Sequence, residues 1–292
     1  MQSRFDLAHL APAIFVLLWA TGFIGAKFGL HYAEPFTFLS LRLLITLAIL
    51  APIAALARKP WPNPRAFLHS AVAGMLVHAA YLGGVFYAIE HGMAAGVAAL
   101  VVALQPLVTA FVAWAMIGEH VRPVQAIGLV AGLAGVGLVL LPKVIGGNAI
   151  AGITAGNILA VAIAVAGISI GAVYQKKHAG GIDIRHSAFA QYAGALPPLA
   201  VAAYLTETGT IAWTWQFAAA LVWLVLVLSI GAIGLLIYLI RANSAARVAS
   251  LFYLVPAVTA IIAYLLFGET LQVVQLVGMA ITLVAVAVAA RN

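Results

Sequence analysis

The segment QPLVTAFVAWAMIGEHVRPVQAIG, residues 105–128, decides the fold because the chain contains it twice. When residues 106–128 are aligned with 256–278, a shift of 150, ten positions are identical. The identities include Pro106 with Pro256, Gly118 with Gly268, Glu119 with Glu269, Gln125 with Gln275 and Gly128 with Gly278. An internal repeat of this kind constrains the architecture before any residue is given a role. The repeat predicts two similar halves.

The composition is that of a membrane protein. Of 292 residues, 65% are hydrophobic and 7% are charged, and the mean hydropathy is +1.15, whereas a soluble domain is about 25% charged. The apolar runs lack the short alternating pattern of barrel strands, so we expect an all-α membrane protein. The absence of cysteine excludes disulfides and thiolate sites. We expect the lipid bilayer as a partner and do not interpret the net charge of +7 as a nucleic-acid footprint.

Ten apolar stretches are long enough to cross a bilayer, which takes roughly 20 residues as a helix. They cover about 8–30, 35–57, 66–89, 93–117, 122–142, 152–175, 184–204, 216–240, 245–267 and 271–290. The first is too long for the apolar part of a signal peptide, so we expect it to be retained. The glycines at 146–147 separate the two predicted halves, 1–145 and 149–292, with five transmembrane helices each.

The basic residues predict the orientation, because Lys and Arg are enriched in cytoplasmic loops. With the N-terminus inside, eleven of the 14 Lys and Arg residues fall on the inner side. Lys27 and Lys143 fall at outer ends, and Arg42 lies within the second span. Both termini are therefore predicted to be cytoplasmic.

An odd number of spans per half inverts the second half relative to the first. At a shift of 151 residues, outer Glu90 pairs with inner Arg241 and outer Gly96 pairs with inner Arg247. In both pairs only the inner copy is an arginine, as the orientation rule requires. The repeat and the charges together predict two inverted five-helix repeats.

The run 86–141 resembles the EamA repeat of the drug/metabolite transporter superfamily. The shared features are a small-residue helix, a mid-helix proline, a Gly-Glu pair at a helix end, and a Gln and a Gly opening the next helix. Here they are Ala94 to Ala99, Pro106, Gly118–Glu119, Gln125 and Gly128, and EPFTFLSLR at 34–42 is similar to the family's second helix. The resemblance covers the whole chain and is specific for the superfamily but weak for the substrate.

This resemblance implies ten helices, cytoplasmic termini, and export or exchange of small metabolites across the cell inner membrane. Within the superfamily, the chain is most similar to exporters of amino acids, including aromatic ones. Export of drugs or of nucleotide-sugar-like metabolites is the alternative, and a membrane scaffold that transports nothing is a further one. Inverted repeats are the usual device of alternating access around a site near the bilayer midplane.

Several polar and aromatic residues fall deep within the predicted spans. His78 and Tyr81 are three residues apart and share one face of the third helix, where a polar group facing lipid is costly. They are candidates for a cavity wall that binds substrate, or alternatively for a hydrogen bond between helices. Individually weaker candidates are Trp19, Gln105, Tyr174, Trp223, Ser229 and Tyr253. Ser229 is the repeat counterpart of His78, so the two halves differ chemically there, as a site for an asymmetric molecule requires.

Five further residues are predicted to have hinge or structural roles. Pro106 and Pro256 lie near the middle of their spans and predict kinks that act as hinges, or else simple packing bends. Glu119 and Glu269 follow glycines at helix ends, where they are expected to cap the amides of the next helix. Arg42 lies about eight residues from the outer end of its span. We expect it to snorkel outward or pair structurally; the alternative is a cavity-facing charge that holds a substrate carboxylate.

The acidic residues all lie at span ends or in loops: Asp6, Glu34, Glu90, Glu119, Asp183, Glu207 and Glu269. Without a mid-membrane carboxylate the usual proton relay is missing, which favours gradient-driven export without obligatory proton coupling. No protease, hydrolase, phosphate-loop or metal motif is present, so we expect no enzyme activity, cofactor or metal. We expect a monomer that binds a small molecule between its halves. The cavity is expected between the third, fourth, eighth and ninth helices, with the first and sixth.

Overall fold

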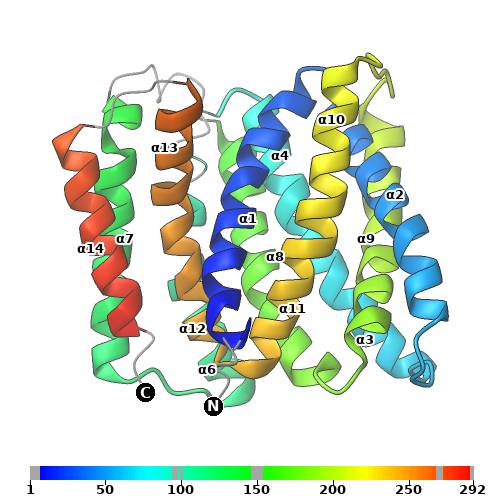
Figure 1. The fold of residues 1–292 in the computed structure, drawn as a ribbon, viewed down its shortest axis with the longest axis horizontal. Coiled ribbons are helices and arrows are strands. Elements are labelled where there is room, and N and C mark those ends of the chain that lie inside the picture. Colours follow the sequence, from blue (N-terminus) through cyan, green and yellow to red (C-terminus); the bar gives the residue numbers. More distant parts are fainter. Residues whose placement is uncertain (1–6, 94–97, 99–100, 146–153, 268–271, 290–292) are drawn as a thin grey trace, which may run out of the picture.

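A computed structural model describes residues 7–93, 98, 101–145, 154–267 and 272–289. Within these ranges the chain forms helices and no strand, and the helices lie roughly alongside one another in one bundle (Figure 1). In the first half they are α1 (Leu7–Leu30), α2 (Pro35–Ala55), α3 (Pro64–Gly74), η1 (Met75–Ala80), α4 (Tyr81–Glu90), α6 (Gln105–Ile117) and α7 (Pro123–Ile145). In the second half they are α8 (Ala155–Ala179), α9 (Ile184–Thr206), α10 (Trp215–Trp223), η2 (Leu224–Ala232), α11 (Ile233–Ala242), α12 (Ala245–Ser250), η3 (Leu251–Tyr253), α13 (Leu254–Phe267) and α14 (Val273–Ala289).

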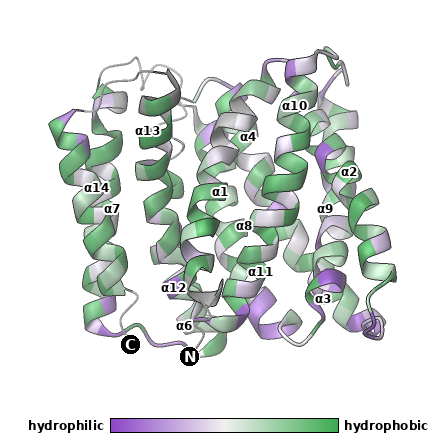
Figure 2. Cartoon of the chain, in the orientation of Figure 1, coloured by the Kyte–Doolittle hydropathy of each residue, from purple (hydrophilic) through white to green (hydrophobic). Residues whose placement is uncertain are grey.

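Five helical segments of the described chain are long and apolar enough to cross a membrane. They are Pro35–Ala55, Pro64–Glu90, Pro123–Pro142, Ala155–Ala179 and Trp215–Ala242, and shorter apolar helices accompany them. Hydrophobic residues predominate along the helices, and hydrophilic residues gather toward their ends (Figure 2). The chain is therefore a multi-pass membrane protein whose spanning segments are helices.

Polar residues just outside the helices supply partners for the first backbone amides, which have none within the helix. The side chains of Asn63, Thr214 and Ser244 accept hydrogen bonds from Ala66 N, Phe217 N and Arg247 N, respectively. Thr154 and Asn157 form a reciprocal capping box at the start of α8. These caps place the polar groups at helix ends and leave the middle of each helix apolar.

Two long helices contain a π-helical segment at positions that are equivalent in the repeat. The segment η1 joins α3 to α4 in the first half, and η2 joins α10 to α11 in the second. Shifted by 151, residues 75–80 of η1 fall within η2. A π-helical turn widens the helix locally and often marks a functional site. The sequence carried no signal for either segment.

Pro106 and Pro256 each follow a change in helical geometry. The helix α6 begins at Gln105, after a turn at 103–104, and α13 begins at Leu254, directly after η3. Pro106 therefore lies in the first turn of a helix that follows a turn, whereas Pro256 lies just after a 3₁₀ segment that joins α12 to α13 without interruption. Proline is tolerated in the first turn of a helix because its missing N–H has no partner there in any case. A hinge role for either proline stays a prediction.

The helices α7 and α14 form a close pair at one side of the bundle (Figure 1). A Cβ atom on Gly278 would lie 2.7 Å from the backbone oxygen of Gly135, and one on Gly135 would lie 2.5 Å from Oγ1 of Thr282. Only glycine permits such an approach between two backbones. The main apolar core lies elsewhere, among α1, α2, α4, α8, α9, η2 and α11.

Candidate functional site

A small cavity lies inside the bundle, between helices of both halves. It is lined by Trp19, Gly22, Arg42, Val77, His78, Tyr81, Leu82, Val85, Phe86, Leu228 and Ile233, which belong to α1, α2, η1, α4, η2 and α11. The volume open to the centre of a water molecule is about 60 Å³, which corresponds to roughly five waters. The cavity is thus small in this structure.

One wall of the cavity is polar. Arg42 is only 6% exposed, and its Nε donates a hydrogen bond of 2.9 Å to Oγ of Ser229 in η2. Of the two expectations for Arg42, the structure shows pairing and not outward snorkelling: the guanidinium lies in the bundle, where a hydroxyl from the other half is its partner. A charge that faces the interior avoids the cost of facing lipid.

His78 belongs to the same polar wall. Its ring is buried and stacks on the ring of Tyr192 at 4.6 Å and 19°. The Tyr192 hydroxyl in turn donates a 2.9 Å hydrogen bond to the backbone oxygen of Ser229. Sequence reasoning missed Tyr192, although it lies deep in the predicted span 184–204 and meets the criterion that selected Tyr81.

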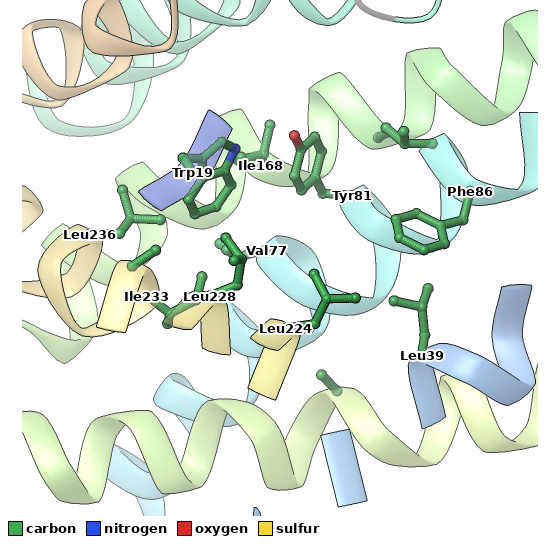
Figure 3. Packing of buried hydrophobic residues seen from close by; sticks show 14 of the residues in the cluster. Trp19, Leu39, Val77, Tyr81, Phe86, Ile168, Leu224, Leu228, Ile233 and Leu236 are labelled. Carbon is green, nitrogen blue, oxygen red and sulfur yellow. The ribbon is translucent and has the colours of Figure 1, made fainter. Parts of the chain in front are cut away.

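Trp19 and Tyr81 form the aromatic wall of the cavity, and Tyr81 lies one turn after His78 on the same helical rod. Trp19 and Tyr81 stack with their ring centroids 6.4 Å apart and their planes 25° from parallel. Figure 3 shows the two rings near Val77 and Leu228, with Phe86 beyond Tyr81. Aromatic faces pack well against planar apolar groups and accept polar contacts at Tyr and Trp edges. The cavity lining therefore combines polar groups, among them Arg42 and His78, with aromatic and apolar ones.

Four of the predicted residues line the cavity together: Trp19, Arg42, His78 and Tyr81. A fifth, Ser229, accepts a hydrogen bond from Arg42. Gln105 is buried away from the cavity, and its backbone oxygen accepts from Oγ of Ser169 at 3.3 Å. Tyr253 packs against Gly132, in the apolar cluster beside α7 and α14.

Two other predicted residues also lie elsewhere. The hydroxyl of Tyr174 is 2.7 Å from Nδ1 of His69, toward the end of α8. Trp223 is 44% exposed and donates its indole N–H to Oγ1 of Thr21. Neither lines the cavity.

Glu119 caps a different helix from the one expected. Its carboxylate accepts a 3.0 Å hydrogen bond from the backbone nitrogen of Ala245, at the start of α12, and forms an ion pair with Lys176. At the start of the next helix along the chain, α7 (Pro123–Ile145), Oε1 of Gln125 accepts a hydrogen bond from Arg122 N. Glu119 thus ties the end of α6 to the second half. Glu269 lies outside the described residues.

No metal centre emerges in the part of the chain that the structure describes, where His, Asp and Glu do not gather in groups of three or more. The cavity residues supply one cation, hydrogen-bonding groups and aromatic faces. Such a set suits the binding of a small organic molecule.

The sequence model of the EamA-like transporter family matches residues 7–141 and again 155–291. The chain belongs to the EamA-like transporter family. The resemblance seen in the sequence is thereby confirmed, and the chain is a membrane transporter of the drug/metabolite type.

Curated relatives agree with this family. The chain is 26% identical to the uncharacterized transporter YvbV of Bacillus subtilis over 92% of this chain and 87% of that protein. It is 28% identical to the uncharacterized inner membrane transporter YedA of Escherichia coli, over 96% and 90%. It is also 28% identical to a protein of Salmonella typhimurium named "probable amino-acid metabolite efflux pump", over 90% and 88%. A solved crystal structure superposes with a TM-score of 0.74 and 20% identity over 96% of both chains, which supports the fold alone.

Proposed function

We propose that this EamA-like transporter exports small organic metabolites, chiefly amino acids and among them aromatic ones, by alternating access around the central cavity. The observation that carries the proposal is the cavity itself, since Trp19, Arg42 and Tyr81 of the first half face Leu228 and Ile233 of the second. A site shared by two repeats changes its access when one repeat moves against the other. The Salmonella relative named as an efflux pump supports the substrate class.

The proposal includes ten spans in two inverted repeats, 1–145 and 149–292, in the inner membrane with both termini cytoplasmic. The arginines at the predicted inner positions support this orientation. The π-helical segments η1 and η2 at equivalent positions support the repeat.

The small cavity corresponds to a closed state in this scheme. A cavity volume of about 60 Å³ is too small for an amino acid with an aromatic ring, since small-molecule sites measure roughly 300–1,000 Å³. The helices must therefore separate for a solute to enter. The helices are least regular at the turn before Pro106, at the 3₁₀ segment before Pro256 and at the π-helical segments beside the cavity.

Transport in this scheme is driven by the solute gradient. Glu34, Glu119 and Glu207 are engaged at helix ends, and the lining residues include no carboxylate. Substrate counterflow in proteoliposomes is expected to persist when the pH gradient is collapsed. Counterflow that disappears with the pH gradient contradicts this part of the proposal.

The decisive experiment is an uptake panel in proteoliposomes across amino acids, drugs and nucleotide sugars. We expect exchange of amino acids, with aromatic ones among the fastest. His78→Ala and Tyr81→Ala are expected to lose about 10-fold or more in rate at normal expression, because each removes a polar or stacking contact with the solute. Tyr204→Ala is the matched control, since Tyr204 is 87% exposed. Unchanged transport in both cavity variants places the site elsewhere, and exchange of only drugs or nucleotide sugars rejects the substrate class.

A further inference from the structure

The Arg42 guanidinium is incompletely paired within the described structure. A guanidinium has five N–H groups, and the side-chain hydrogen bond that Arg42 makes there is the one from Nε to Ser229. Arg42 is 6% exposed and lines the cavity. Its two terminal nitrogens thus remain available to a molecule in the cavity.

A buried cation without a counter-ion is costly, and an anion that enters the site offsets this cost. Arginine suits a carboxylate in particular, because two parallel N–H groups meet its two oxygens. Because Nε donates to Oγ of Ser229, the orientation of the planar guanidinium is restricted. The geometry favours a carboxylate next to Arg42, with the rest of the solute against the rings of Trp19 and Tyr81.

An amino group would find no matching anion. The lining residues of the cavity include no Asp or Glu. Of the described carboxylates, Glu207 accepts from Phe36 N, Glu119 pairs with Lys176, and Asp183 pairs with Arg185. The positive field of Arg42 also repels a second cation in a space of low dielectric. The site therefore distinguishes the two charged ends of an amino acid.

We propose that the cavity recognises organic anions: Arg42 binds the carboxylate, the aromatic wall binds an apolar body, and an amino group is not required. Apolar monocarboxylic acids that lack an amino group are then substrates beside amino acids, and the corresponding amines are not. This inference rests on the proposed transport function, whose substrate class it narrows.

Equilibrium binding tests the inference without any variant. The purified full-length chain in detergent micelles is incubated with radiolabelled 3-phenylpropionate and competed with unlabelled 3-phenylpropionate, L-phenylalanine or phenethylamine. We expect both acids to displace the label and phenethylamine, which has the same ring and an amine in place of the carboxylate, to fail at 10-fold higher concentration or more. Absence of specific 3-phenylpropionate binding overturns the inference, and so does displacement by phenethylamine at the concentration of the acids.

Variants sharpen the assignment to Arg42. Arg42→Gln is expected to weaken 3-phenylpropionate binding by about 10- to 100-fold, and Arg42→Lys by less, because lysine keeps the charge and loses the fork. Arg185→Gln, which changes an arginine paired with Asp183 outside the cavity, is the control and is expected to bind like the parent chain. A monodisperse Arg42→Gln that binds with unchanged affinity contradicts the assignment.

Counterflow of the same three compounds in proteoliposomes separates this inference from the proposed function. Binding of the acid without exchange of any of them contradicts transport and supports the anion site. Exchange of phenethylamine as fast as 3-phenylpropionate supports transport and contradicts the anion site.

Discussion

The α7–α14 pair and the cavity use the repeat in opposite ways. In the pair, the equivalent positions 128 and 278 hold the same residue: a Cβ on Gly128 would lie 2.8 Å from Ala289 N, and one on Gly278 would lie 2.7 Å from Gly135 O. In the cavity, equivalent positions differ, with His78 in η1 and Ser229 in η2. The repeat is kept at this glycine contact between two helices, and it differs at the position where Ser229 is the partner of a buried arginine.

This contrast separates the residues that hold the fold from those that meet a solute. A change in the pair acts on stability, because close backbone contact leaves no room for a side chain. A change in the cavity acts on transport, because its polar groups are arranged around a space.

The largest effect is expected for Gly135→Leu on α7. Its Cβ would lie 2.5 Å from Oγ1 of Thr282, and overpacking of this kind costs about 1–3 kcal/mol or more. We expect a large loss of folded protein and of thermal stability. Gly137→Leu on the same helix is the matched control, since a Cβ there meets nothing within 4 Å. Fluorescence-detected size-exclusion chromatography measures both, and equal folded yields contradict the close-packed pair.

A smaller effect is expected from removing one hydroxyl in each region. Tyr81→Phe, in the cavity, should slow amino-acid exchange several-fold with little change in stability. Tyr253→Phe, beside α7 and α14, removes a buried hydroxyl that has no hydrogen-bond partner in the described structure. We expect it to leave exchange unchanged and to raise stability by up to about 1 kcal/mol. Amino-acid exchange and thermal melting are measured for both variants. Slower exchange in Tyr253→Phe but not in Tyr81→Phe would contradict the assignment of the solute site to the cavity.

The smallest effect is expected away from both regions, at Asp183. A side-chain hydrogen bond from Arg185 lowers the pKa of the Asp183 carboxyl to about 2, below its ordinary value of about 3.9. A lowered carboxyl pKa stabilises the folded state above the ordinary pKa, and this contribution is lost as the pH falls through 2. Because the pair is partly exposed, Asp183→Asn should lower Tm by at most about 2 °C at pH 7. The difference in Tm between the parent chain and Asp183→Asn should shrink as the pH is lowered from 7 to 2. A difference that grows in acid contradicts the pairing of Asp183 with Arg185.

Much of the fold was predictable because apolar length and small-residue repeats are local signals. The sequence indicated helical spans, and Gly128 and Gly278 marked a repeated position that proved to be a close helix contact. For the site, the depth of His78, Tyr81 and Trp19 within their spans was enough to select three residues that line one cavity.

The remainder depends on contacts between distant parts of the chain. Arg42 has a side chain long enough to reach the interface or the interior, and the Ser229 hydroxyl, 187 residues away, favours the interior. Glu119 accepts from Ala245 N, 126 residues away along the chain, which its position beside α7 in the sequence did not reveal. The depth of Trp223 and Tyr174 in their spans said nothing about which way each side chain faces, and both lie away from the cavity.

Accessibility of single cysteines tests the central claim most directly, since the chain has none of its own. Val77→Cys places a thiol in the cavity wall, and Val136→Cys places one in the buried face of α7. A membrane-impermeant maleimide is applied to right-side-out and to inverted vesicles, with and without amino acid. Alternating access predicts that Val77→Cys reacts from both sides, more slowly when the solute is bound, and that Val136→Cys reacts from neither. Reaction of Val77→Cys from one side only, or at a rate that the solute leaves unchanged, contradicts transport through this cavity.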